Sequence, residues 1–447
     1  MNTIYDIPEV GRWRRGGGLV RIPPGVDVPL TDRVRRLIDT SAFRRLAQIR
    51  QLGLVSLVYP AANHTRQEHS LGVFLAAIEY LDRLAADERF AAVVSPPDAE
   101  ALLAAALLHD VGHFPFGHPI EDLHLPRIPG HEEFACRHIL GDELAGVLRD
   151  SWGLDAADVA DLVCGKVTGR PQRILRSILS GPIDVDKIDY LMRDSLHAGV
   201  PYGEHFDRRR LVGSLCLNAA GDALAITDKG KTAAEMMVFA RYVMFSEVYW
   251  HHAVRSATAM FQRAFFSLQD TIDLDGVLPM SERPMIDALF AAAAGRPAAE
   301  LLNGIFGSKR VLFKRLAQYS YFEEPELYRR LARRPYPELV QAAAAIAATL
   351  GKALGQRVAP HEVLVDAPPT ELEVEFDIDV LFPKQHVYRR LGHISPVVRT
   401  LAQEQFDDYV KRVLIFIHPR IAAEAQRLSN LSERLADAID ARSANGA

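Results

Sequence analysis

The stretch EALLAAALLHDVGHFPFGH at residues 100–118 joins an apolar segment to a histidine-containing loop. The apolar segment favours a helix, and the Gly and Pro residues that follow it break that helix. His109 and Asp110 stand side by side where the helix ends, so both side chains can turn toward one point. An imidazole nitrogen with a carboxylate oxygen is a donor set suited to Mn, Fe, Co, Ni or Zn. We therefore expect a helical core with part of a metal site at one helix end.

One His-Asp pair supplies only two ligands, so further donors must come from elsewhere in the chain. His69 begins an amphipathic stretch, HSLGVFLAAIEYL, directly after a polar turn. A further acidic source is IDVDKIDYLMRD, where Asp186, Tyr190 and Asp194 lie four residues apart and share a helix face. A solvated helix face is the alternative explanation of this stripe.

Histidines are concentrated around this helix end, since half of the chain's 16 lie between positions 64 and 138. Glu121 follows His118 by three residues, so the two share one side of a helical turn. Imidazole has an unperturbed pKa of about 6.5 and exchanges a proton at neutral pH, so these histidines are candidate acids and bases. Solvated or structural loop histidines remain the alternative.

The remaining pattern is mostly helical, with short strands. Helices are predicted over 32–39, 41–50, 69–85, 99–109, 132–148 and 233–268, the last nearly uninterrupted. Hairpins are predicted over 19–22 with 26–30 and over 215–218 with 224–227. The segment 371–382 alternates apolar and acidic residues like a strand, and 412–417 is its expected partner. A loop-rich zone over 273–310 is the best candidate for a domain boundary.

Composition excludes several classes of protein. The 447 residues are 49% hydrophobic and 24% charged, as in soluble packed proteins, and the formal net charge of −5 argues against a globally cationic nucleic-acid binder. The three cysteines are too few and too widely spaced for a disulfide framework or a CxxC metal site. No signal-peptide core and no apolar run of membrane-spanning length is evident, so we expect a cytoplasmic protein.

Four blocks in order resemble a known family. The pattern His69…His109-Asp110…Asp186 resembles the signature of the HD-domain metal-dependent phosphohydrolases. QLGLVSLVYPAANHTRQEHSLGV, HDVGHFPFGH, GHEEFA and IDVDKIDYLMRDSLHAGV resemble the deoxynucleoside triphosphate triphosphohydrolases of that superfamily, from about residue 20 to about residue 260. The resemblance implies a mainly α, HD-domain helical fold with small β-hairpins. It also implies metal-dependent hydrolysis of a dNTP to deoxynucleoside and inorganic triphosphate.

On this basis we expect an HD phosphohydrolase domain over 1–270 and a C-terminal α+β appendage over 271–447. The resemblance implies a divalent ion (Mn, Fe, Zn, Ni, Co or Mg) with the ligands His69, His109, Asp110 and Asp186. It implies the catalytic residues His113, His118, Glu121 and His131. It implies phosphate or sugar contacts from Arg66, Lys187, Tyr190 and Arg241, and contacts near the 3′-hydroxyl from Gln51 and Asp194.

The resemblance also implies a homo-oligomer, whereas an allosteric nucleotide stays open and a single-stranded nucleic acid is not indicated. An HD-type phosphomonoesterase or phosphodiesterase for another nucleotide is the second hypothesis. The HDxxED pattern of guanosine-tetraphosphate hydrolases is absent, because His113 and Phe114 stand where two acids belong. A non-catalytic nucleotide or nucleic-acid binding protein is the third hypothesis, and the complete ligand set weighs against it.

Overall fold

The chain divides into two units whose segments interleave along the sequence. The computed structural model describes residues 3–16, 20–369, 378–404 and 410–443. The first unit comprises Met1–Pro115, Pro129–Met244 and Glu375–Glu404, and the second comprises Phe116–Ile128, Phe245–Val374 and Gln405–Ala447. The expected domain boundary at residue 270 stays a prediction. Each of the two units contains segments from before and after that residue.

The first unit is mainly helical, as predicted. Its longer helices are α4 (Arg66–Leu84), α6 (Pro96–Leu108), α8 (His131–Ile139), α10 (Ala156–Cys164), α11 (Arg170–Leu179), α12 (Val185–Ala198) and α14 (Lys231–Met244). Its shorter helices include α1 (Pro8–Arg14), α2 (Asp32–Ile38), α3 (Ser41–Arg45), α5 (Glu88–Ala91), α9 (Asp142–Val147) and α13 (Arg208–Gly213), with α21 (Leu391–Ile394) and α22 (Pro396–Val398) near the C-terminus.

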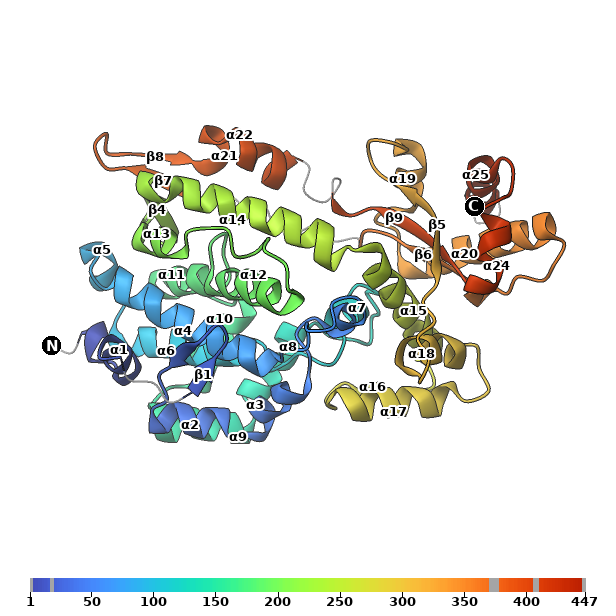
Figure 1. The fold of residues 1–447 in the computed structure, drawn as a ribbon. Helices are drawn as coiled ribbons and strands as arrows, with labels where there is room; N and C mark the ends of the chain where they lie inside the picture. The colour runs from blue at the N-terminus through green and yellow to red at the C-terminus, as the bar shows by residue number, and fades with distance from the viewer. Residues whose placement is uncertain (1–2, 17–19, 370–377, 405–409, 444–447) are drawn as a thin grey trace. The chain divides into compact units, whose positions relative to one another are not determined.

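Helix α6 forms the buried centre of the first unit. Ser95 and Asp98 cap its first turn reciprocally, and Pro96 occupies the first helical position. All nine residues from 99 to 108 other than the half-buried Glu100 are buried and apolar. Helix α4 packs against both α6 and α12 (Figure 1), so the ends of these three helices set the geometry of any site built on them.

Both predicted hairpins are present in the first unit. Strands β1 (Val20–Ile22) and β2 (Val26–Val28) pair antiparallel. Strands β3 (Leu215–Leu217) and β4 (Leu224–Thr227) pair antiparallel and continue into a four-stranded sheet of order β3-β4-β7-β8. In that sheet β7 (Asp379–Phe382) runs parallel to β4 and antiparallel to β8 (Val387–Arg390).

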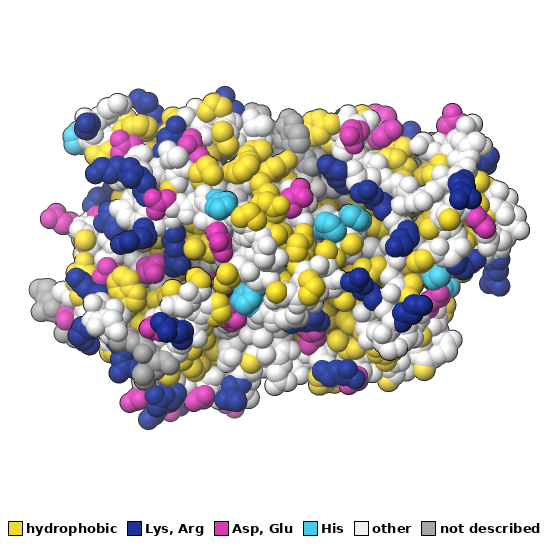
Figure 2. All heavy atoms as spheres, in the orientation of Figure 1, with side chains coloured by type: hydrophobic (Ala, Val, Ile, Leu, Met, Phe, Trp, Pro, Cys, Tyr) yellow, Lys and Arg dark blue, Asp and Glu magenta, His cyan; other side chains and the backbone are white. Residues whose placement is uncertain are grey.

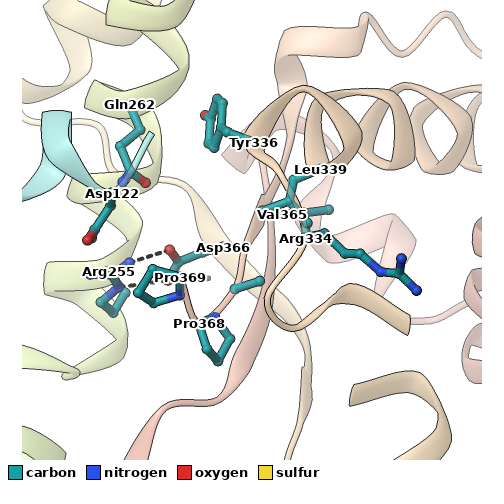
Figure 3. A pocket seen from close by; sticks show the side chains of 11 residues that line it. Asp122, Arg255, Gln262, Arg334, Tyr336, Leu339, Val365, Asp366, Pro368 and Pro369 are labelled. Atoms are coloured by element: carbon teal, nitrogen blue, oxygen red, sulfur yellow. Dashed lines mark hydrogen bonds and ion pairs between the residues drawn. The ribbon is translucent and has the colours of Figure 1, made fainter. Parts of the chain in front are cut away.

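The second unit contains α7 (Gly117–Glu121), α15 (His252–Leu268), α16 (Leu274–Val277), α17 (Glu282–Ala293), α18 (Ala298–Phe306), α19 (Pro325–Leu331), α20 (Tyr336–Leu354), α24 (Pro419–Ala425) and α25 (Leu431–Ser443). Its antiparallel sheet has the order β5 (Lys314–Tyr319), β9 (Val413–Ile417), β6 (Val363–Asp366). A cavity of about 20 Å³ lies within this unit, with Asp122, Arg255, Asp366 and Tyr336 among its lining residues (Figure 3).

The expected pairing of 412–417 with 371–382 is wrong. Both edges of β9 are taken by β5 and β6, and all five of its residues are buried, as suits a central strand. Of the alternating segment, residues 371–377 lie outside the described residues, and β7 pairs with β4 and β8 instead. Periodicity indicates that a segment is a strand but not which strand it pairs with.

Two long helices predicted from the sequence are interrupted. The expected helix 233–268 ends at Met244, and after one π-helical turn a new helix begins at His252. His251 has a non-helical backbone, with φ of −56° and ψ of 129°, and its Nδ1 accepts a hydrogen bond from the Ala253 amide, which is an N-cap interaction. The expected helix 132–148 is likewise divided at Gly141, the N-cap of α9.

Two of the three cysteines are bonded to each other. Cys136 of α8 and Cys164 of α10 form a disulfide with their Cα atoms 6.6 Å apart, a pairing that the sequence spacing did not indicate. Cys216 is free and buried. Among the described residues, no helix is both long enough and apolar enough to cross a membrane. Acidic and basic side chains are interspersed over the face seen in Figure 2.

Candidate metal centre

Four predicted ligands from three helices come together in the first unit. His69 lies in the first turn of α4, His109 caps the end of α6 with Asp110 next to it, and Asp186 lies in the first turn of α12. The Nε2 atom of His69 is 3.0 Å from Asp186 Oδ1 and 3.3 Å from His109 Nε2. His109 Nε2 is 3.3 Å from Asp110 Oδ1 and 3.9 Å from Asp186 Oδ1.

The hydrogen bonds of both imidazoles leave the same ring nitrogen available. His69 Nδ1 lies 2.9 Å from Asp189 Oδ2, and His109 Nδ1 lies 2.9 Å from the Ala106 carbonyl oxygen. Since both partners only accept, each Nδ1 donates to its partner, and the two Nε2 atoms face the same point. Two ligands at about 2.0–2.2 Å from one ion lie roughly 3–3.5 Å apart. The His69–Asp186, His69–His109 and His109–Asp110 separations match this range. The donor set therefore fits a divalent metal ion.

The charges around this point favour a cation. Burial by itself would lower the pKa of His69, but hydrogen bonds with Asp186 and Asp189 and the charge of Asp110 raise it to about 10. Burial would raise the pKa of Asp110, yet His109, Arg66 and His113 hold it well below its usual range. Asp110 is therefore ionised, and the site carries the negative potential that a metal ion would neutralise.

Arg66 and His113 contact the same carboxylate. Arg66 Nη1 donates to Asp110 Oδ2 at 2.7 Å, and His113 Nε2 lies 3.3 Å from Asp110 Oδ1. The His131 ring stacks on the His113 ring with 3.8 Å between centroids. Burial, then the positive charge of Arg66, lowers the pKa of His113 well below its usual value, so this imidazole is held neutral. The structure thus brings His113 and His131 together beside Asp110.

The predicted pair His118 and Glu121 belongs to the second unit. Both lie on the short helix α7, with His118 Nδ1 3.7 Å from Glu121 Oε2 and the imidazole largely exposed. Phe116, with φ of 57°, precedes this helix and packs on Phe261. Gln262 Nε2 donates to the Pro119 carbonyl at 2.9 Å, so α15 supports α7 within this unit.

The first unit also contains three residues predicted to contact phosphate or sugar. Lys187 and Tyr190 are half-buried, and Arg241 is buried. Lys187 Nζ donates to Asp184 Oδ2 at 2.6 Å and to the Gly181 carbonyl at 3.1 Å. Burial raises the pKa of Tyr190 to about 12, although the positive charges of Arg241 and Lys187 oppose the rise. The phenol therefore stays protonated. These three residues offer two cations and a hydroxyl donor in the same unit as the metal centre.

Gln51 and Asp194 are both connected to one histidine that sequence reasoning did not assign to the site. His64 Nε2 lies 2.9 Å from Asp194 Oδ1, and the His64 carbonyl accepts from the Gln51 amide at 3.0 Å. His64 is buried, and its ring stacks on His197 with centroids 4.4 Å apart. The Gln51 Oε1 atom is buried without a hydrogen-bond partner among the described residues.

Sequence reasoning also missed the residues behind His69. Asp189 is not among the predicted site residues, yet it bonds His69 Nδ1 and is held by Arg193. The available signal was their spacing, since Asp189 and Arg193 are four apart on α12. That spacing is equally typical of a solvated helix face, so the pattern alone does not distinguish the two.

Comparisons with known proteins identify the family of these segments. A model of the HD domain matches residues 66–194, and a model of the HD-associated region matches residues 206–429. The chain is 33% identical over 303 residues to an uncharacterized protein of Methanocaldococcus jannaschii, over 66% of this chain and 59% of the relative. It is 29% identical over 249 residues to the deoxynucleoside triphosphate triphosphohydrolase SAMHD1 homolog of Dictyostelium discoideum, over 54% of this chain and 47% of the relative.

Among solved structures, a hypothetical protein from Aquifex aeolicus matches with a TM-score of 0.66 at 26% identity, over 89% of this chain and 95% of that chain. The two curated relatives are matched over only 59% and 47% of their own length. The four clustered donors and Arg66 all lie within the segment that the HD model matches.

Proposed function

Because the chain belongs to the HD-domain family of metal-dependent phosphohydrolases, we propose that it hydrolyses deoxynucleoside triphosphates to deoxynucleoside and inorganic triphosphate. The observation that carries the proposal is the convergence of His69, His109, Asp110 and Asp186, with both imidazole Nε2 atoms turned to one point. The likeness to a relative named as a deoxynucleoside triphosphate triphosphohydrolase supports the substrate class.

A divalent ion held by these four residues would withdraw charge from phosphoryl oxygens and lower the pKa of a bound water toward about 7. A triphosphate needs cations to bind it, and Arg66, Lys187 and Arg241 lie in the unit that carries the metal centre. The Arg66 guanidinium is already oriented by Asp110, so it binds phosphate with little further loss of side-chain freedom.

The proton for the departing 5′-oxygen is assigned to His118. Its imidazole is largely exposed, and the Glu121 carboxylate lies 3.7 Å from its Nδ1 as the nearby negative charge. His113 is a poorer donor, because burial and Arg66 keep it neutral. His131, stacked on His113, is assigned to the active site as a positioning group for that ring. Gln51 and Asp194 are assigned to the sugar 3′-hydroxyl.

The remaining assignments rest on the family resemblance. We propose that the protein is a homo-oligomer in the cytoplasm. The proposal does not include activation by a second nucleotide. The metal is one of Mn, Fe, Zn, Ni, Co or Mg, and the mixed nitrogen and oxygen donors favour a transition metal over Mg.

The test is product analysis. The purified protein is incubated with each dNTP and rNTP and with each metal in turn, and products are separated by chromatography. Deoxynucleoside with intact inorganic triphosphate supports the proposal. Release of orthophosphate or pyrophosphate assigns another phosphohydrolase reaction, and metal and nucleotide binding without turnover assigns a binding protein.

A further inference from the structure

His69 of α4 is the first member of a buried series of side chains that continues through Asp189 to Arg193. His69 Nδ1 bonds Asp189 Oδ2 at 2.9 Å. Arg193 donates hydrogen bonds to both carboxylate oxygens of Asp189, one from Nε and one from Nη2, each at 2.8 Å. The Asp189 and Arg193 side chains are 6% and 4% exposed, so this is a desolvated, bidentate ion pair rather than a solvated helix face.

Helix α4 has a gap that accommodates this ion pair. Gly72 lies three residues after His69, and a Cβ atom built on it would come within 1.9 Å of Asp189 Oδ1 and 2.3 Å of Arg193 Nη2. A glycine inside a helix costs roughly 0.5–1 kcal/mol relative to alanine. The glycine is therefore explained by the space that the ion pair needs, and not by the backbone of α4.

The side of Arg193 that faces away from Asp189 is hydrogen-bonded as well. Arg193 Nη1 donates to Glu68 Oε1 at 2.6 Å and to the Pro23 carbonyl at 3.2 Å. His197 Nε2 lies 2.8 Å from Glu68 Oε1. Every nitrogen of the Arg193 guanidinium thus has an acceptor, and its orientation is fixed on both sides.

We propose that Asp189 and Arg193, seated against Gly72, are positioning residues that fix the tautomer and orientation of His69 for the metal ion. The inference rests on the proposed metal site and names residues that hold one of its ligands from behind. Carboxylates that accept from the outer nitrogen of a metal-binding imidazole keep the metal-facing nitrogen unprotonated and aimed. Arg193 fixes that carboxylate, and Gly72 makes room for both.

The test is a titration of metal-stripped protein with Co²⁺ alone, followed by its visible absorption. The variants are Arg193→Gln, Arg193→Lys and Gly72→Ala. Loss of such an outer partner typically weakens metal binding about 10–100-fold, and we expect that loss with an altered Co²⁺ spectrum for Arg193→Gln and Gly72→Ala. Arg193→Lys keeps the charge but not the two-pronged grip, so it should recover part of the affinity.

Two control variants separate positioning from general packing. Glu79 lies on α4, as His69 does, and its Oε2 is 2.8 Å from Nη2 of Arg208 on α13. Glu79→Gln removes this ion pair. Gly146→Ala adds a Cβ to a helical glycine whose nearest neighbour would be 3.9 Å away. Both should bind Co²⁺ as wild type does.

The double variant Gly72→Ala/Arg193→Gln should bind Co²⁺ no more weakly than the weaker single variant, because both act through Asp189. Wild-type Co²⁺ affinity and spectrum in Arg193→Gln, or an equal loss in Glu79→Gln, would overturn the inference. If Gly72→Ala does not fold, the two Arg193 variants decide the matter. Because Co²⁺ binding needs no nucleotide, this result stands apart from any failure of triphosphohydrolase activity.

Discussion

The Nε2 atoms of His69 and His109 lie 3.3 Å apart, although the two residues are 40 positions apart in the sequence. Each ring donates from Nδ1, to Asp189 and to the Ala106 carbonyl, so in each ring Nε2 is the nitrogen left to bind a metal ion. Asp110 and Asp186 place carboxylate oxygens beside these two nitrogens, which adds the negative charge that a metal ion would neutralise. This arrangement is the physical basis of the metal assignment.

Removal of either acid should abolish metal binding. We expect Asp110→Ala and Asp186→Ala to lose most bound metal and nearly all turnover, since each removes an anionic ligand from a set of four. Metal content is measured by elemental analysis and helicity by circular dichroism, which should persist. Asp161→Ala, at an exposed acid of α10, is the control and should retain metal. Stoichiometric metal in both site variants would contradict the assignment.

The proton donor is tested on α7. We expect His118→Ala to lower the rate by roughly 10²–10⁴-fold with metal content and nucleotide affinity near wild type, the usual worth of a positioned proton donor. Glu121→Ala should act in the same direction but more weakly, because it orients and polarises His118. Steady-state rates and a metal assay on the same preparations are the measurements.

The double variant His118→Ala/Glu121→Ala should be little slower than His118→Ala alone, because the two groups act as one unit. Losses that multiply would show that they act independently. Wild-type turnover in His118→Ala would move the proton donor to another histidine of the site.

A pH effect on stability is expected in the second unit. Burial raises the pKa of Asp122 to about 6, although the charges of Arg255 and Lys411 oppose the rise. The folded state therefore binds the proton more tightly than the unfolded state, so stability falls as pH rises from about 4 to about 6 and stays lower above that. Asp122→Asn cannot ionise and escapes this loss.

We expect Asp122→Asn to gain on the order of 1–3 kcal/mol over wild type at pH 7 and nothing below pH 4, at about 1.4 kcal/mol per pKa unit. Urea unfolding across this pH range measures the difference. Asp270→Asn, at an exposed acid of the same unit, should show no such trend. A stability difference between Asp122→Asn and wild type that does not change with pH would rule out the buried acid as its source.

The sequence and the family resemblance predicted four candidate metal ligands, and these four residues lie close together in the structure. His109 and Asp110 follow an uninterrupted apolar helix, and Asp186, Tyr190 and Asp194 lie four residues apart on α12. The interruption at His251 was not predicted, because the apolar pattern runs through it and the N-cap depends on one imidazole contact. The partners of β9 were misassigned, because strand pairing depends on contacts between distant segments.

The support behind His69 was the least predictable part of the site. A charged pair four apart on a helix is normally solvated, and only its burial against Gly72 distinguishes Asp189 and Arg193 from that common case. Likewise, His64 is not among the predicted site residues, yet its backbone carbonyl bonds Gln51 and its ring bonds Asp194. Both features depend on tertiary packing, which residue spacing does not encode.

Identification of the products released from a dNTP in the presence of a divalent transition metal tests the proposed triphosphohydrolase activity. Wild type should release deoxynucleoside and inorganic triphosphate in equal amounts, and Asp110→Ala should release neither. Release of a deoxynucleoside monophosphate with pyrophosphate, or of a diphosphate with orthophosphate, would contradict it.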